Sequence, residues 1–168
     1  MFSFLQEYKT LKHSLNIRQL IKVDLPQVAS IILDNELFPP EYLDKMTQTF
    51  FDQNSQEMWF VADSSESGVI GVAYCAPERM TQGAWNLLLI AVMPEHHGNG
   101  VGSQLIRRIE QYVRPMDARV LLIETSGLEA FSNTRKFYPK CGYRQVATIP
   151  EYYDTGDDKV VFWKSMLD

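Results

Sequence analysis

Hydrophobic residues recur along the chain with two spacings, one typical of helices and one typical of strands. Spacings of three and four residues favour helices, and short apolar runs bounded by turn residues favour strands. The predicted helices cover 24–34, 41–51, 100–113 and 129–140. The predicted strands cover 16–21, 58–62, 69–76, 85–92, 119–123, 143–149 and 160–166.

This order of elements predicts an α/β (α+β) fold with a mixed central sheet of about six to seven strands flanked by helices. The strands at 85–92 and 119–123 are joined by the helix at 100–113, which predicts a parallel pair with a crossover connection. A length of 168 residues with 45% hydrophobic residues suits one domain with its own core. We expect that domain at 16–168 and an N-terminal extension at 1–15, helical to about residue 13, which packs on the body or on a second subunit.

Charge and composition exclude several classes of protein. The net charge is −5 and the Lys and Arg residues are dispersed, which argues against binding to nucleic acid. No apolar run reaches the length of a membrane span, and the apolar start of the chain is too short for a signal peptide. Cys75 and Cys141 show no metal-ligand spacing, so no metal is expected. We therefore expect a cytoplasmic protein without membrane attachment.

The segment PEHHGNGVGSQLI, residues 94–106, follows the strand at 85–92 and opens the helix at 100–113. Gly98, Gly100 and Gly102 lack a Cβ, so the backbone can adopt left-handed dihedral angles and approach a ligand closely. The first amides of a helix are unpaired and lie at the positive end of its dipole. The segment therefore predicts a phosphate or pyrophosphate site. An ordinary strand-to-helix turn is the alternative, but it does not need three alternating glycines.

Two motifs in this order resemble the GNAT acetyltransferase superfamily. The acetyl-CoA signature of that family falls on 97–102, where His97 replaces the usual Arg or Gln, and NTRKFYPKCGY at 133–143 is similar to its second motif. The resemblance implies acetyl-CoA as the acetyl donor, held where two neighbouring strands splay apart. The implied donor contacts are Ile90, Ala91, Val92, His97, Gly98, Asn99, Gly100, Val101, Gly102, Ser103 and Asn133.

Acetyl transfer needs a deprotonated amine, a polarised thioester carbonyl and a proton for the leaving thiolate. The resemblance implies that a backbone amide near Val92 polarises the carbonyl and that Tyr138 supplies the proton. The strand at 85–92 lacks the carboxylate that often acts as the base in the family, and Asn86 is its only polar residue. Glu124, at the end of the next strand, is the predicted base, with a solvated strand-end carboxylate as the alternative. His96 is a weaker candidate for the base. For Tyr138, the alternative is that it serves only as an aromatic residue of the core.

The acceptor is expected to lie between 35–40 and 151–158. The candidate contacts are Asn35, Phe38, Tyr152, Tyr153 and Asp154. Aromatic faces beside negative charge suit an ammonium group, which favours a primary amine as the acceptor. A solvated acidic hairpin turn is the alternative. The sequence leaves open whether the acceptor is a small amine, an amino acid or a protein amine, and whether the chain forms a homodimer.

Parts of the sequence are also compatible with two other functions. Gly98, Gly100 and Ser103 approximate a dinucleotide fingerprint and Glu124 follows about twenty residues later, as in a dinucleotide-dependent oxidoreductase. The third glycine is absent, and too few strands follow. An acyl-CoA sensor or scaffold without turnover is the second alternative, favoured by the missing carboxylate and disfavoured by Tyr138.

Overall fold

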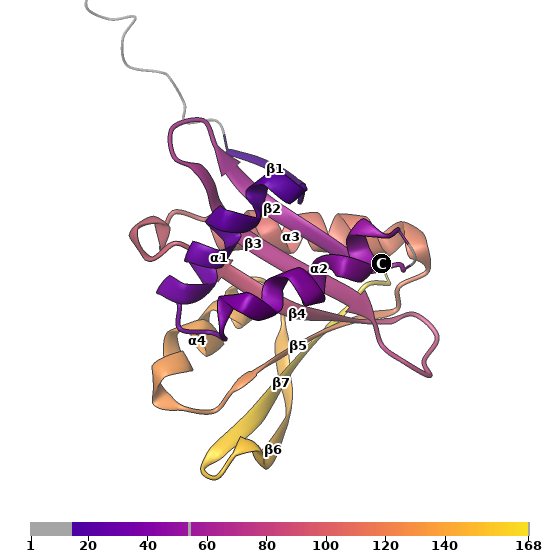
Figure 1. Ribbon diagram of the computed structural model, residues 1–168. Helices are drawn as coiled ribbons and strands as arrows, with labels where there is room; N and C mark the ends of the chain where they lie inside the picture. The colour runs from indigo at the N-terminus through magenta and orange to yellow at the C-terminus, as the bar shows by residue number, and fades with distance from the viewer. Residues whose placement is uncertain (1–14, 54, 168) are drawn as a thin grey trace, which may run out of the picture.

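The computed structural model describes residues 15–53 and 55–167. Its sheet has seven strands in the order β1-β2-β3-β4-β5-β7-β6, so the prediction of a mixed sheet of six to seven strands is confirmed (Figure 1). The strands are β1 (Leu15–Gln19), β2 (Met58–Ser64), β3 (Gly68–Pro77), β4 (Ala84–Val92), β5 (Val120–Ser126), β6 (Arg144–Asp154) and β7 (Asp157–Ser165). The helices are α1 (Leu25–Asp34), α2 (Leu43–Phe51), α3 (Val101–Val113) and α4 (Ser132–Lys140).

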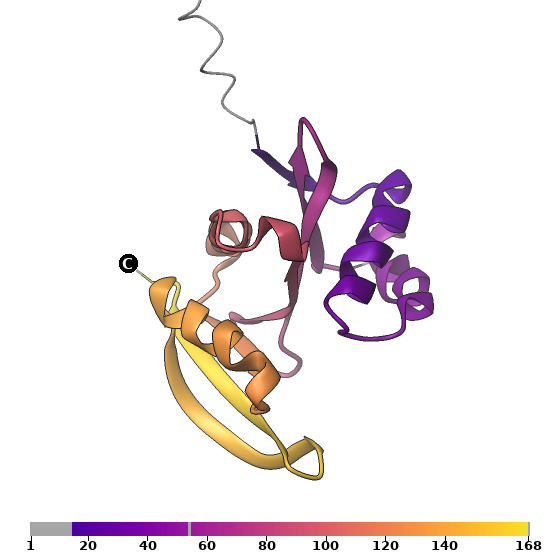
Figure 2. The same ribbon diagram turned by 90° about the vertical axis from the view of Figure 1, so that its left-hand side faces the viewer.

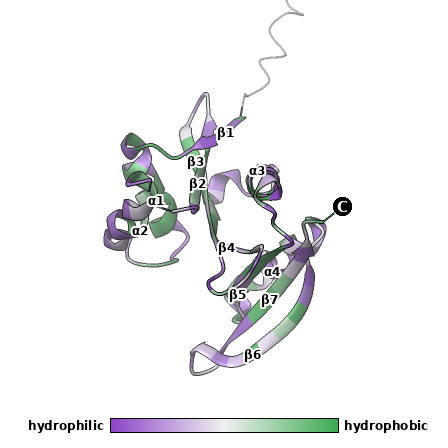
Figure 3. Ribbon diagram, turned by 90° about the vertical axis from the view of Figure 1, so that its right-hand side faces the viewer, coloured by the Kyte–Doolittle hydropathy of each residue, from purple (hydrophilic) through white to green (hydrophobic). Residues whose placement is uncertain are grey.

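Helices cover both faces of the sheet. In Figures 2 and 3, α1 and α2 lie on one side of the strands β1 to β4, and α3 lies on the other side. The buried face of α1 presents Ile31 and Ile32, and the buried face of α3 presents Leu105 and Ile109. Apolar residues at helical spacing meet the two faces of the sheet, which gives one core cluster on each side.

The parallel pair is short. Residues Ala84–Leu87 of β4 pair with Val120–Ile123 of β5, and among the described residues the pairing of these two strands ends there. On its other side β4 continues to pair with β3 as far as Val92. The register of β3 and β4 shifts beside Leu88, which is left without a partner residue and is 51% exposed. β4 and β5 therefore separate after Leu87, as the resemblance implied.

The hairpin of β6 and β7 corrects one expectation. Residues 151–158 were expected to form a loop, but β6 continues to Asp154 and β7 begins at Asp157. Gly156 adopts a φ of 78°, which permits a tight turn, and the side chain of Asp154 accepts a hydrogen bond from the backbone N–H of Thr155 at 2.7 Å. Tyr152 and Tyr153 favour an extended backbone. The prediction of a loop at this place was therefore wrong.

Other differences are small. Gly100 lies just before α3 instead of inside it, and α4 begins at Ser132 after a 3-10 turn at Glu129–Phe131. The expected N-terminal helix lies outside the described residues, so it stays a prediction together with the extension at 1–15. Among the helices that are described, none is long and apolar enough to cross a bilayer. Residues 15–53 and 55–167 also contain no group of three His, Cys, Asp or Glu side chains arranged to hold a metal.

Candidate functional site

The glycine loop follows β4 through a 3-10 turn at Pro94–His96 and ends where α3 begins. Gly98 has a φ of 77° and Gly100, the N-cap of α3, has a φ of 79°. A Cβ added at either glycine would meet no atom within 4 Å, so the loop is open on that side. Left-handed backbone and an open approach to the first amides of α3 are the geometry that an anion site requires.

Gly102 serves another purpose. It lies inside α3, and an added Cβ would come within 3.1 Å of Phe137 Cζ on α4. Its φ is not among the positive values, so the expectation of a left-handed dihedral at this residue was wrong. Gly102 instead lets α3 and α4 approach each other beside the loop. Ser103, one residue later, lies 3.8 Å from Cys141 at the end of α4, as measured from Oγ to Sγ.

Two predicted site residues converge on one backbone oxygen. The Nδ2 atom of Asn35 donates a hydrogen bond to the carbonyl of Val92 at 3.0 Å, and His97 Nε2 lies 2.7 Å from the same oxygen. For His97 to bond a carbonyl, its Nε2 must carry the proton. These contacts join the end of α1, the end of β4 and the start of the glycine loop. His97, predicted as a cofactor contact, and Asn35, predicted as an acceptor contact, are therefore neighbours.

The separation of β4 from β5 leaves backbone groups on one edge of β4. Met93 donates its N–H to the carbonyl of Ile70 at 2.8 Å, which fixes the alternation of the ladder between β3 and β4. By that alternation Ala91 bonds β3, whereas the backbone N–H groups of Ile90 and Val92 point away from β3 toward the split. Ala91 was predicted as a donor contact, but its backbone faces β3 and its side chain is buried in the core.

Tyr138 is buried on α4, with 3% of its surface exposed. Its ring lies 5.1 Å from that of Phe162 on β7 and 5.6 Å from that of Phe137, measured between centroids. Burial raises the pKa of the phenol, so the group keeps its proton across the physiological range. Tyr138 is thus a core aromatic, and its role as a proton donor stays a prediction. Asn133 lies exposed in the first turn of α4.

Glu124 has a partner that the sequence did not indicate. The ammonium of Lys159 lies 2.6 Å from Glu124 Oε2 and 3.5 Å from the centroid of the Tyr152 ring. Burial alone would lower the pKa of Lys159, but its contacts with Glu124 and Tyr152 outweigh burial and raise the pKa. The aromatic and acidic setting predicted to receive a substrate ammonium therefore already contains an ammonium of the chain itself. The role of Glu124 as the base stays a prediction.

The other predicted acceptor residues have structural contacts of their own. Phe38 packs against the core between the sheet and α1, and the ring of Tyr153 lies 5.1 Å from that of Tyr152 in an edge-to-face arrangement. Asp154 is engaged in the hairpin turn. A carboxylate that the sequence reading missed is Glu78, which accepts a hydrogen bond from Asn86 at 2.7 Å.

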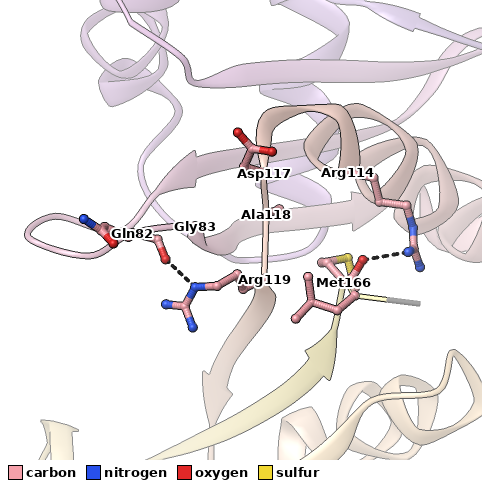
Figure 4. Close-up of a pocket in the computed structure, with 8 residues that line it drawn as sticks. Gln82, Gly83, Arg114, Asp117, Ala118, Arg119 and Met166 are labelled. Atoms are coloured by element: carbon pink, nitrogen blue, oxygen red, sulfur yellow. Dashed lines mark hydrogen bonds between the residues drawn. The ribbon is translucent and has the colours of Figure 1, made fainter.

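A pocket lies at the opposite end of β4 and β5 (Figure 4). Its volume is about 580 Å³. It is lined by Gln82, Gly83, Arg114, Asp117, Ala118, Arg119, Met166 and Leu167. Arg119 donates to the carbonyl of Gln82 at 2.7 Å and Arg114 to that of Met166 at 2.8 Å, so both guanidinium groups bind backbone. The pocket lies where β4 and β5 begin, whereas the glycine loop follows the end of β4. The pocket is therefore separate from the donor site.

Known proteins are similar to this chain in sequence and in fold. Residues 27–143 match the acetyltransferase (GNAT) family. An uncharacterised N-acetyltransferase of Methanocaldococcus jannaschii is 27% identical over 151 residues, which span 88% of this chain and 90% of that protein. A crystal structure from Desulfovibrio desulfuricans, described as belonging to the GNAT family, matches with a TM-score of 0.80 and 25% identity over 91% of this chain and 99% of that one. An aminoglycoside 6'-N-acetyltransferase solved with coenzyme A matches with a TM-score of 0.72 and 16% identity, over 91% and 98% of the two chains.

Proposed function

The chain belongs to the acetyltransferase (GNAT) family, and on that premise we propose that it transfers an acetyl group from acetyl-CoA to a primary amine by direct attack in a ternary complex. The observation that carries the proposal is that the split between β4 and β5 opens at the end of β4 from which the glycine loop departs. One ligand with an extended amide-bearing arm and a diphosphate can use both features at once.

The chain's groups fit such a donor. The open loop at Gly98 and Gly100 offers the first amides of α3 to a diphosphate, as does the positive end of the helix dipole. The N–H groups of Ile90 and Val92 face the split, where they can bond the amide carbonyls of the pantetheine arm. Acetyl-CoA supplies the activated acetyl group, and the residues of the chain hold it and move protons.

Two groups assist the transfer in this proposal. A backbone N–H on the edge of β4 that faces the split, that of Ile90 or of Val92, stabilises the negative charge that develops on the thioester oxygen, because a fixed dipole costs no reorganisation. The phenol of Tyr138 donates its proton to the departing thiolate. Support for that role comes from the burial of Tyr138, which favours the protonated form.

The acceptor amine approaches from the face of the sheet that carries α1 and α2. Glu124, Lys159 and Tyr152 lie on the part of this face contributed by β5, β7 and β6. Because Lys159 neutralises Glu124, these residues form a wall of the acceptor site and do not supply a net negative charge. We infer a primary amine acceptor whose further recognition depends on shape and hydrogen bonds.

The proposal is tested by measuring free CoA from acetyl-CoA with a panel of amines: spermidine, benzylamine, glycinamide and a tripeptide that begins with alanine. Release of CoA with at least one amine, and an acetylated product detected by mass spectrometry, is the expected result. Binding of acetyl-CoA without turnover of any amine would indicate a sensor or scaffold instead. Quenching of tryptophan fluorescence by NADH but not by acetyl-CoA would indicate an oxidoreductase.

A further inference from the structure

A row of residues crosses β2, β3 and β4 on the face of the sheet that carries α1 and α2. Ala76 on β3 is opposite Asn86 on β4, and since Met58 pairs with Cys75, the preceding residue Glu57 falls opposite Ala76 on the other side. Side chains alternate between the faces of a strand, so Glu78 points to the same face as Ala76. The side chains of Glu57, Glu78 and Asn86 therefore flank Ala76 on this face of the sheet.

Asn86 is the buried member of this group, with 2% of its surface exposed. Its Nδ2 donates a hydrogen bond to Glu78 Oε1 at 2.7 Å, and its Oδ1 is buried without a hydrogen-bond partner among residues 15–53 and 55–167. A buried acceptor that lacks a partner is unfavourable, because it has given up water without gaining another hydrogen bond. Such groups are rare in folded proteins, and each one calls for an explanation. Here Asn86 holds a carboxylate with one end of its amide, while the other end is enclosed without a partner.

The position of Asn86 connects this group to the donor site. Asn86 is paired with Leu122 on β5, and the pairing of the two strands ends one residue later, at Leu87. Trp85 and Leu87 belong to the core under α3, so Asn86 points to the opposite face. The pair of Glu78 and Asn86 therefore lies at the closed end of the split, on the face from which the acceptor approaches.

The carboxylates on this face differ in their partners. Glu124 contacts the ammonium of Lys159 at 2.6 Å, and Glu57 accepts a hydrogen bond from the hydroxyl of Tyr74 at 2.9 Å. Burial, together with the hydrogen bond to Glu57, raises the pKa of Tyr74, which remains a neutral donor. Glu78 is bonded by a neutral amide and is partly exposed. Glu57 and Glu78 both have neutral partners and are both partly exposed, and of the two Glu78 is the one bonded to Asn86, on the strand that borders the split.

Titratable or charged groups near Glu78 come from several elements. On the face of β2 and β3 they are Glu57 and the phenol of Tyr74, and on the turn after β3 the neighbour is Arg79. The backbone of Glu78 is fixed by its own N–H, which donates to Ala84 at 2.8 Å, and by its carbonyl, which accepts from Thr81 Oγ1 at 2.9 Å. The carboxylate is thus carried on a braced turn, and its orientation is set by Asn86.

We propose that Glu78 is the base that takes the proton from the acceptor amine, and that Asn86 is the positioning residue that aims it. The inference rests on the proposed acetyl transfer. The bond between the amine nitrogen and the acetyl carbon forms as the bond from that carbon to sulfur breaks. The proton leaves the nitrogen for Glu78, directly or through one water. The sulfur takes a proton from the phenol of Tyr138, and a proton from solvent then restores that phenol.

The test is the pH profile of kcat/KM for acetyl-CoA with the fastest amine of the panel. Glu78→Gln is expected to lower kcat/KM at pH 7.5 by about 10²-fold and to remove the acidic limb of the profile. Glu129→Gln, on the exposed turn before α4, is the matched control and stays within about twofold of the unmodified protein, a change worth less than ~0.5 kcal/mol. Acetyl-CoA affinity, from tryptophan quenching, and the melting temperature are expected to be unchanged in both variants.

A second variant separates the role from folding. Glu78→Gln combined with Asn86→Asp exchanges the carboxylate and the amide between the two positions, and it is expected to recover at least tenfold of the lost kcat and the acidic limb. If Glu78→Gln keeps the original profile, or if Glu124→Gln loses the acidic limb while Glu78→Gln retains it, the assignment is overturned. A double variant that folds but recovers nothing also counts against it. Absence of CoA release by the unmodified protein with every amine would instead refute the proposed function.

Discussion

The ammonium of Lys159 lies between the carboxylate of Glu124 and the ring of Tyr152, at 2.6 Å from Oε2 of the first and 3.5 Å from the centroid of the second. The three residues belong to β7, β5 and β6, so one buried cation joins three adjacent strands. Because the ion pair and the ring contact share one ammonium, loss of that charge affects all three strands together.

Replacement of Lys159 by Met is expected to destabilise the protein by about 1–3 kcal/mol, because it leaves the partly buried carboxylate of Glu124 without its partner. Chemical denaturation at pH 7 measures the change. The pKa of Lys159 is raised above its ordinary value of 10.5, so the ammonium's contribution is complete below pH 10.5 and is lost as the pH rises through the raised pKa. Lys159→Met combined with Glu124→Gln should be more stable than Lys159→Met alone. Equal stability of the two would mean that the ion pair contributes nothing.

Replacement of Gly100 by Ala is expected to weaken acetyl-CoA binding and to destabilise the protein by roughly 1–2 kcal/mol, because its φ of 79° is strained for any residue with a Cβ. Gly156 provides the matched control, since its φ is 78° and an added Cβ there also meets nothing within 4 Å. Gly156→Ala should lose similar stability and keep the donor affinity. A titration of each variant with acetyl-CoA, followed by tryptophan fluorescence, checks the difference. Equal loss of affinity in both would remove the glycine loop as the donor site.

Replacement of Tyr138 by Phe is expected to lower kcat by about 10²-fold, which is typical for loss of a general acid, without changing the affinity for acetyl-CoA. The melting temperature should change little, because the ring and its contacts with Phe137 and Phe162 are retained. Steady-state kinetics with the best amine of the panel measures the effect. Unchanged turnover would leave Tyr138 with its packing role alone.

Asp24 is expected to make stability depend on acid pH. Hydrogen bonds from Arg18, at 2.7 and 2.9 Å, lower the pKa of Asp24 below its ordinary value of 3.8. The stabilisation is therefore present above pH 3.8 and is lost as the pH falls through the lowered pKa. Asp24→Asn should cost about 1.5–3 kcal/mol at pH 7, and the difference from the unmodified protein should shrink below pH 4 in urea denaturation. A constant difference across this range would rule out the ionised pair as the cause.

Most of the fold could be predicted because periodicity alone separates the helices from the strands. The pattern of Leu105, Ile106 and Ile109 has the spacing of one helix face, and that face is buried against the sheet. The continuation of β6 and β7 into 151–158 was missed because the acidic residues of this segment were interpreted as a loop. The strand preference of Tyr152 and Tyr153 and the turn preference of Gly156 outweighed these acidic residues, so β6 extends to the turn.

The candidate site was predictable where one segment makes it, and less so where distant segments meet. The glycine loop is continuous in sequence, and its position after β4 follows from that. Lys159 and Glu124 are 35 residues apart in the sequence, and their contact depends on the register between β5 and β7. Periodicity does not specify a register between strands, so Lys159 was overlooked. The contact of Gly102 with Phe137 likewise depends on how two helices pack.

The early end of the pairing between β4 and β5 has a consequence for mutational tolerance. The edge that faces the split consists of main-chain N–H and C=O groups, which every non-proline residue carries alike. Apolar exchanges at 88–92 therefore leave the hydrogen-bonding capacity of the opening intact, whereas a proline at Ile90 or Val92 removes a donor outright. The opening for the donor is encoded by strand register, so side chains along it can diverge while the opening is retained.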